Sequence, residues 1–118
     1  MQYISSISLW IRTILIFVFL GWMYILLALF LSPKQLHPFA KKACGVLLSA
    51  MGQTVHIHGS WPVLKTPRIY VFNHASLLDT LVCIAHIPEY TSSIGKKEQF
   101  SIPIWGWILK HWGCIPID

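Results

Sequence analysis

The sequence predicts an α/β fold that follows an N-terminal apolar helix. Three observations lead to this prediction. Residues 13–32 contain no charged side chain, and about 20 such residues cross the apolar core of a bilayer as a helix. After residue 53, short apolar runs typical of strands alternate with segments of helical periodicity. Strands that alternate with helices along a chain are typical of a layered domain with a largely parallel sheet.

The composition indicates contact with a membrane. Hydrophobic residues make up 55% of the 118 residues and charged residues only 11%, whereas soluble domains are about a quarter charged. The net charge of +5 suits an anionic bilayer surface or a phosphate ligand. The Lys and Arg residues are scattered, so nucleic acid is not an expected partner. Three widely spaced cysteines indicate buried, reduced thiols rather than disulfides.

Residues 13–32, "TILIFVFLGWMYILLALFLS", are predicted to form a membrane helix that ends before Pro33. A cleaved signal peptide fits less well, because the apolar stretch is long and no small-residue cleavage site follows it. Lys34, Lys41 and Lys42 follow this helix, whereas only Arg12 precedes it, and this excess of cations places its C-terminal side in the cytoplasm. A full span and a shallow, re-entrant insertion both fit the pattern.

A second helix is predicted over residues 38–51, because Pro38 suits the first helical position and Gly52 the position past the end. Apolar side chains recur along it at three- and four-residue spacing, at Phe39, Ala43, Val46, Leu47 and Ala50. A basic amphipathic helix of this kind can lie on the lipid surface as part of a two-helix anchor, or pack against the domain that follows. Residues 1–52 are therefore expected to form the anchor and its amphipathic helix.

From residue 53 onward we expect the element order β-β-α-β-α-β. The strands are expected at 54–58, 68–72, 91–95 and from 114, and the helices at 76–86 and 103–112. The second of these helices has one apolar face, which serves either the domain core or an interfacial membrane contact; it consists of Ile104, Trp105, Ile108, Leu109 and Trp112. The sequence ends inside the last expected strand, so residues 53–118 are expected to be an incomplete domain.

Candidate chemistry lies in "YVFNHASLLDTL", residues 70–81. His74 follows an apolar strand, and binding groups in α/β folds gather at the carboxyl ends of strands. If the loop at His74 folds over the start of the next helix, Asp79 can hold one ring nitrogen and leave the other as a general base. The segment from Ser76 to Asp79 is also a capping box, S-x-x-D, which needs no catalytic role. Both interpretations remain open on the sequence.

Other polar residues give weaker indications. Lys96 is a candidate for binding a phosphate or a developing oxyanion, or is a solvated surface lysine. His56 and His58 share one face of an expected strand, and the pattern H-x-H can bind a metal. No third ligand lies near them in the sequence, so no metal site is expected.

The segment "NHASLLDTL" resembles the first motif, N-H-x-x-x-x-D, of the glycerolipid acyltransferases, the family that includes 1-acylglycerol-3-phosphate acyltransferase. The apolar run before Asn73 and the stretch "GKKEQFSIPIWGWILKHWGCIPID" from Gly95, with its P-x-x-G-W pattern, are similar to the family as well. The resemblance thus extends from about Thr54 to the end, and a hydrophobic N-terminal anchor is common in the family. It implies O-acyl transfer in phospholipid biosynthesis, with His74 as base, Asp79 orienting it and Lys96 near a phosphate.

The implied reaction moves a fatty acyl group from acyl-CoA or acyl carrier protein to 1-acylglycerol 3-phosphate, and it needs no cofactor and no metal. Membrane lipids, lysophosphatidic acid and the acyl donor are the implied partners. The alternatives are another acceptor such as glycerol 3-phosphate or a lyso-aminolipid, a truncated non-catalytic membrane protein, and a metal-dependent hydrolase that uses His56, His58 and His74. The family's later motifs do not occur within these 118 residues, so we expect this segment alone to be inactive.

Overall fold

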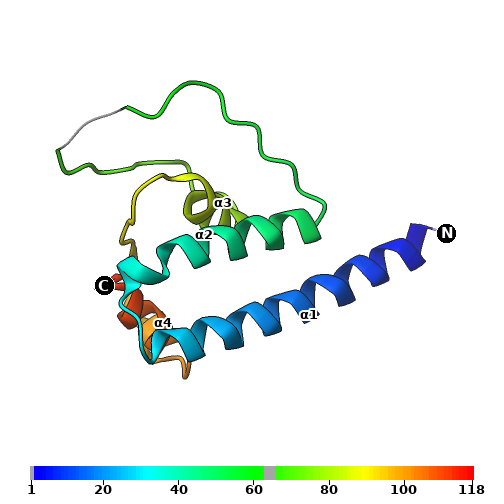
Figure 1. Cartoon of the computed structure of the whole chain (residues 1–118), viewed down its shortest axis with the longest axis horizontal. Helices are drawn as coiled ribbons and strands as arrows, with labels where there is room; N and C mark the ends of the chain where they lie inside the picture. The colour runs from blue at the N-terminus through cyan, green and yellow to red at the C-terminus, as the bar shows by residue number, and fades with distance from the viewer. Residues whose placement is uncertain (1, 63–65) are drawn as a thin grey trace.

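The computed structural model describes residues 2–62 and 66–118, and it begins with a helical hairpin (Figure 1). Helix α1 (Gln2–Ala28) and helix α2 (Pro33–Ala50) lie side by side in opposite directions. Two side chains of α1 donate hydrogen bonds to the carbonyl oxygen of Ala50 at the end of α2, Arg12 Nη2 at 2.7 Å and Thr13 Oγ1 at 3.2 Å. The last carbonyls of a helix lack partners and carry the negative end of its dipole, so a guanidinium there stabilises the hairpin.

Within the described residues, α1 is the one helix long and apolar enough to cross a membrane. The qualifying part is Ser6–Ala28, with a mean hydropathy of 2.2, and 11% of it is buried within the protein. The sequence placed this helix at 13–32, whereas the structure begins it earlier and ends it at Ala28. Membrane spans and signal sequences share this length and composition.

Helix α2 starts five residues before the predicted position. Pro33 occupies its first turn, and the backbone N–H of Ser32 donates to Gln35 Oε1 at 2.9 Å, which closes a capping box. The predicted apolar stripe is also wrong in part, because Val46 is 49% exposed. Helix α2 contacts both α1 and the next helix, α3, so its buried side is broader than one stripe and consists of Leu36, Ala40, Cys44, Leu47, Leu48 and Ala50.

The remaining elements alternate between helix and strand. Helix α3 (Leu78–His86) is followed by strand β1 (Ile94–Lys96), the short 3-10 helix η1 (Lys97–Ser101), helix α4 (Trp105–Trp112) and strand β2 (Ile115–Ile117). Strands β1 and β2 pair in parallel, with Ile94 opposite Ile115 and Lys96 opposite Ile117. This part agrees with the predicted α/β order and with the predicted parallel pairing.

The two strands predicted at 54–58 and 68–72 are not formed in the described part of the chain. Both segments are extended but neither pairs with another strand, and together they follow the open course in the upper part of Figure 1. Ile69 and Val71 are 91% and 90% exposed. An apolar run favours extended backbone, but a β-ladder also needs a neighbouring strand in register.

A core cluster joins α4 to the helical hairpin. Trp112 of α4 is buried against Ala28 of α1 and Leu36 and Ala40 of α2. Its indole Nε1 donates to the carbonyl oxygen of Thr91 at 3.0 Å. The predicted apolar face of α4 therefore divides, because Trp112 enters the core while Trp105 remains 43% exposed.

Candidate functional site

The loop before α3 brings His74 and Asp79 together, as the sequence predicted. The carboxylate oxygen Oδ2 of Asp79 lies 3.1 Å from Nδ1 of His74. The same oxygen accepts the backbone N–H groups of Ala75 and Ser76, each at 2.8 Å. The loop therefore folds over the first turn of α3, and His74 stands outside the helix beside its N-terminus.

These contacts favour the ionised form of the Asp79 carboxylate. The backbone N–H of Ser76, then His74 and the N–H of Ala75, hold the pKa of Asp79 below its usual value. An ionised carboxylate can only accept a hydrogen bond, so the contact requires a proton on Nδ1 of His74. In the neutral imidazole, Nε2 then offers its lone pair. Nε2 makes no hydrogen bond to any residue in 2–62 or 66–118, and the His74 side chain is 59% exposed. The arrangement can accept a proton from a bound hydroxyl group.

The predicted cap is displaced by one residue, because Leu77 rather than Ser76 is the N-cap residue of α3 and its side chain makes no capping bond. Helix α3 begins at Leu78 rather than at Ser76, and Ser76 Oγ accepts the backbone N–H of Leu78 at 3.2 Å. Asp79 contributes the carboxylate half of the capping interaction through the N–H of Ser76. One carboxylate oxygen thus serves helix capping and histidine orientation at the same time.

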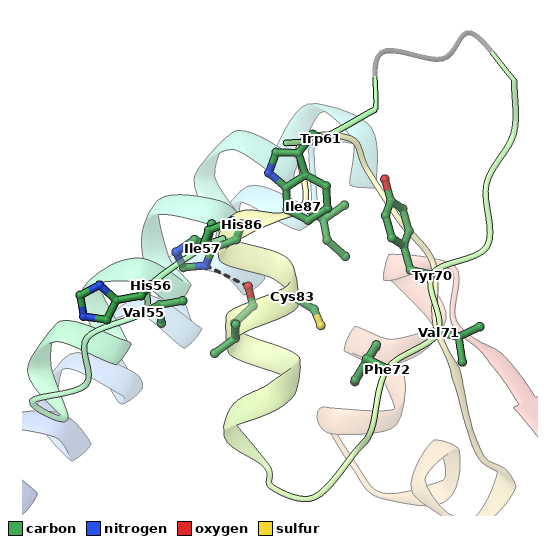
Figure 2. Close-up of a pocket in the computed structure, with 11 residues that line it drawn as sticks. Val55, His56, Ile57, Trp61, Tyr70, Val71, Phe72, Cys83, His86 and Ile87 are labelled. Carbon is green, nitrogen blue, oxygen red and sulfur yellow. Dashed lines mark hydrogen bonds between the residues drawn. The ribbon is translucent and has the colours of Figure 1, made fainter. Parts of the chain in front are cut away.

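An apolar cavity of about 310 Å³ lies beside this pair, between α3 and the extended segments before it (Figure 2). Phe72 connects the two features, because it lines the cavity and its ring centroid is 6.0 Å from that of His74. Burial and the charge of Asp79 raise the pKa of Cys83 on the cavity wall. The lining comprises Val55, His56, Ile57, Trp61, Tyr70, Val71, Phe72, Val82, Cys83, His86 and Ile87.

This cavity was not among the features predicted from the sequence. The spacing of Val82, Cys83 and His86 on one side of α3 was a usable indication, since residues three and four apart share a helix face. The opposing wall comes from segments that are distant in sequence, and its position depends on tertiary contacts that periodicity does not report.

The remaining predicted site residues lie apart from the pair. Lys96 is exposed at the end of β1 and makes no hydrogen bond or ion pair with His74 or Asp79 in the described structure. His56 and His58 are exposed on an unpaired segment, and only His56 borders the cavity. Over residues 2–62 and 66–118, no group of three or more His, Cys, Asp or Glu side chains is arranged to hold a metal ion.

Comparison with known proteins identifies relatives of this chain. A curated protein of Helicobacter pylori (strain J99), named 1-acyl-sn-glycerol-3-phosphate acyltransferase, is 34% identical over 79 residues, which cover 67% of this chain and 32% of the relative. A protein of Cocos nucifera with the same name is 38% identical over 61 residues, 52% of this chain and 20% of the relative. The chloroplastic enzyme LPAT1 of Arabidopsis thaliana, also so named, is 29% identical over 86 residues, 71% of this chain and 24% of the relative.

The chain thus spans about a third or less of the length of these relatives. No solved structure matches it at a comparable level of significance. The family model described as Acyltransferase matches residues 54–118, which is more than half of the chain and includes His74, Asp79 and Lys96. The chain therefore belongs to the acyltransferase family.

Proposed function

We propose that the protein transfers a fatty acyl group from acyl-CoA or acyl carrier protein to the free hydroxyl of 1-acylglycerol 3-phosphate, which yields phosphatidic acid for phospholipid synthesis. The observation that carries this proposal is the 3.1 Å contact between His74 Nδ1 and Asp79 Oδ2. It leaves Nε2 of His74 available as a general base beside an apolar cavity. The names of the three relatives support lysophosphatidic acid as the acceptor.

The proposed reaction needs no covalent acyl-enzyme and no resident cofactor. Nε2 of His74 takes the proton of the acceptor hydroxyl while its oxygen attacks the carbonyl carbon of the thioester. Asp79 stabilises the imidazolium that forms, since its ionised carboxylate lies against Nδ1. When the tetrahedral intermediate collapses, the carbon–sulfur bond breaks and the leaving thiolate takes the proton from His74.

The apolar cavity is the proposed site of an acyl chain. Its volume of about 310 Å³ is at the lower end of the range of about 300–1,000 Å³ for ligand pockets. Phe72 lines the cavity and its ring contacts that of His74. An acyl chain in the cavity would therefore have its thioester near Nε2. An acyl chain bound against this apolar wall would displace water from beside the base, which favours transfer to the hydroxyl over hydrolysis.

The membrane is the proposed location, with α1 as the anchor and the acyltransferase part on the cytoplasmic side. The exposed apolar surface of Ser6–Ala28 supports insertion. Three lysines follow α1, at Lys34, Lys41 and Lys42, and this excess of cations on its C-terminal side supports the orientation. Lys96 is proposed to attract the acceptor phosphate as an exposed cation at the carboxyl end of β1.

The test is a transfer assay on the intact gene product, expressed from its own gene and kept in membranes. Release of free CoA from acyl-CoA is followed with lysophosphatidic acid, glycerol 3-phosphate or a lyso-aminolipid as acceptor. We expect transfer to lysophosphatidic acid that His74→Ala abolishes and that the control His58→Ala, at another exposed histidine, preserves. Transfer that survives His74→Ala would refute the proposal, and a preference for another acceptor would refute the assigned substrate. Residues 1–118 alone are expected to be inactive, because His74 is open to water.

A further inference from the structure

We propose that the turn before α4, together with the first turn of α4 itself, is a second membrane contact, which inserts into the headgroup region of the bilayer beside the end of α1. This inference rests on the membrane anchor in the proposed function and adds a surface to it. The contact surface, here called the tryptophan turn, consists of Ile102, Ile104, Trp105 and Trp107. Their exposed fractions are 50%, 61%, 43% and 40%, although each is a large apolar side chain.

Hydrogen bonds fix the position of the tryptophan turn relative to α1. On α4, His111 Nε2 donates to the carbonyl oxygen of Leu31, and its Nδ1 accepts from the hydroxyl of Tyr24, both at 3.2 Å. The ring of Trp107 stacks on that of His111, with centroids 5.3 Å apart and planes inclined by 22°. Trp107 is therefore one ring away from Leu31, just past the end of α1, and Figure 1 shows α4 at this end of the hairpin.

This position corresponds to the membrane–water interface if α1 is in the bilayer. The apolar span ends at Ala28, and the residues next to it, Leu29 and Phe30, are 62% and 85% exposed. The tryptophan turn thus extends an apolar surface that already faces lipid. Tryptophan is enriched at this depth because its ring is apolar and its N–H finds polar partners in the headgroup region.

The polar atoms of the turn fit the same environment. The buried Trp112 has its indole N–H satisfied by Thr91, whereas those of Trp105 and Trp107 have no hydrogen-bond partner among residues 2–62 and 66–118. Two exposed cations, Lys110 on α4 and Lys34 at the start of α2, flank the junction. Ammonium groups beside exposed aromatic rings favour an anionic lipid surface.

The test measures the depth of single spin labels in vesicles of phosphatidylcholine and phosphatidylglycerol. In the intact gene product, Cys44, Cys83 and Cys114 are replaced by Ala, and any further native cysteine likewise. One cysteine is then introduced at Ile104, with Ile102 as a second position in case the first disturbs folding. A label at Phe19, 63% exposed on α1, reports insertion of the anchor, and a label at Ile69, 91% exposed on the segment that leads to His74, is the matched control.

We expect the labels at 19 and 104 to collide more with dissolved oxygen than with a water-soluble nickel complex, and the label at 69 to show the reverse. A lipid-like label at 19 with a water-like label at 104 would overturn this inference and leave the anchor intact. A water-like label at 19 would overturn both the lipid contact of the tryptophan turn and the membrane anchor α1. A label at 104 shielded from both reagents would indicate burial against protein, such as a second copy of the chain, and would also overturn the lipid contact. The acyl-transfer assay is independent of all these readings.

Discussion

The carboxylate oxygen Oδ2 of Asp79 accepts from the backbone N–H groups of Ala75 and Ser76 while it lies 3.1 Å from Nδ1 of His74. The backbone contacts fix the carboxylate on the first turn of α3, and the carboxylate in turn fixes the histidine ring. Helix capping and histidine orientation are therefore two consequences of one geometry. Substitutions at Asp79 and Ser76 can separate their contributions.

Asp79→Asn is expected to reduce acyl transfer by the intact gene product by roughly 10²- to 10⁴-fold, the usual contribution of general-base catalysis. The amide cannot stabilise an imidazolium at His74 as a carboxylate does. The matched variant Ser76→Ala removes only the bond from Leu78 N–H to Ser76 Oγ, and should cost about 1 kcal/mol of stability with little loss of turnover. Rate and melting temperature are measured for both; an Asp79→Asn enzyme that is merely less stable would leave capping as the sole role.

The stability contributed by Asp79 should depend on pH. Its pKa in the folded protein lies below the usual 3.8, mainly because of the N–H of Ser76 and then His74. A lowered pKa means that the contribution is complete above about pH 3.8 and is lost as the pH falls through the folded value. The difference in melting temperature between the wild type and Asp79→Asn should therefore shrink as the pH falls below 3.8. The control Asp118→Asn changes a side chain that is 88% exposed, so its melting temperature should differ little from that of the wild type at every pH.

Glu89 is expected to hold the segment that leads into His74. Its Oε1 accepts from the hydroxyl of Tyr70 at 2.6 Å and lies 3.2 Å from Arg68 Nη1, and these contacts take the place of a β-ladder. Glu89→Ala should lower both the melting temperature and the His74-dependent rate, whereas Glu98→Ala, at an exposed glutamate of η1, should lower neither. The losses of stability caused by Glu89→Ala and Tyr70→Phe should be less than additive in the double variant, because both substitutions remove the same hydrogen bond from the Tyr70 hydroxyl to Glu89. Full additivity would show that the contact does not stabilise the segment.

The sequence predicted those features that depend on local pattern. The long apolar run produced α1, and helical spacing together with a cap produced α3, within two residues of the predicted start. The contact between His74 and Asp79 was also predictable, because five residues of loop and first helical turn bring the two side chains together. The chemical role of the pair stays a prediction until a transfer assay is made.

Features that depend on distant neighbours were not predictable in the same way. The extended segments 54–58 and 68–72 have strand-like sequences, but whether they pair depends on a partner strand elsewhere. The buried side of α2 depends on its contacts with both α1 and α3. On α4, periodicity grouped Trp105 with Trp112, while the docking of Trp112 against Leu36 and Ala40 separates them into exposed and buried residues.

The glycine of the P-x-x-G-W pattern has a steric explanation that yields a sharp prediction. A Cβ at Gly106 would lie 2.2 Å from the carbonyl oxygen of Phe100 and 2.6 Å from its carbonyl carbon. These are backbone atoms of η1, so they cannot move aside as a flexible side chain would. The Gly106 N–H also donates to the carbonyl oxygen of Ile102 at 2.7 Å, which holds α4 closely against η1.

Gly106→Ala should therefore destabilise the protein by about 1–3 kcal/mol or more, as overpacking does, and should loosen Trp112 from the hairpin. The matched control is Gly45→Ala in α2, where a Cβ would meet no atom within 4 Å. That substitution should stabilise the helix by roughly 0.5–1 kcal/mol, because Ala loses less backbone freedom than Gly on folding. Chemical denaturation in detergent micelles compares the two, with tryptophan fluorescence as the readout. A Gly106→Ala protein as stable as the wild type would show that α4 and η1 pack less closely than the structure indicates.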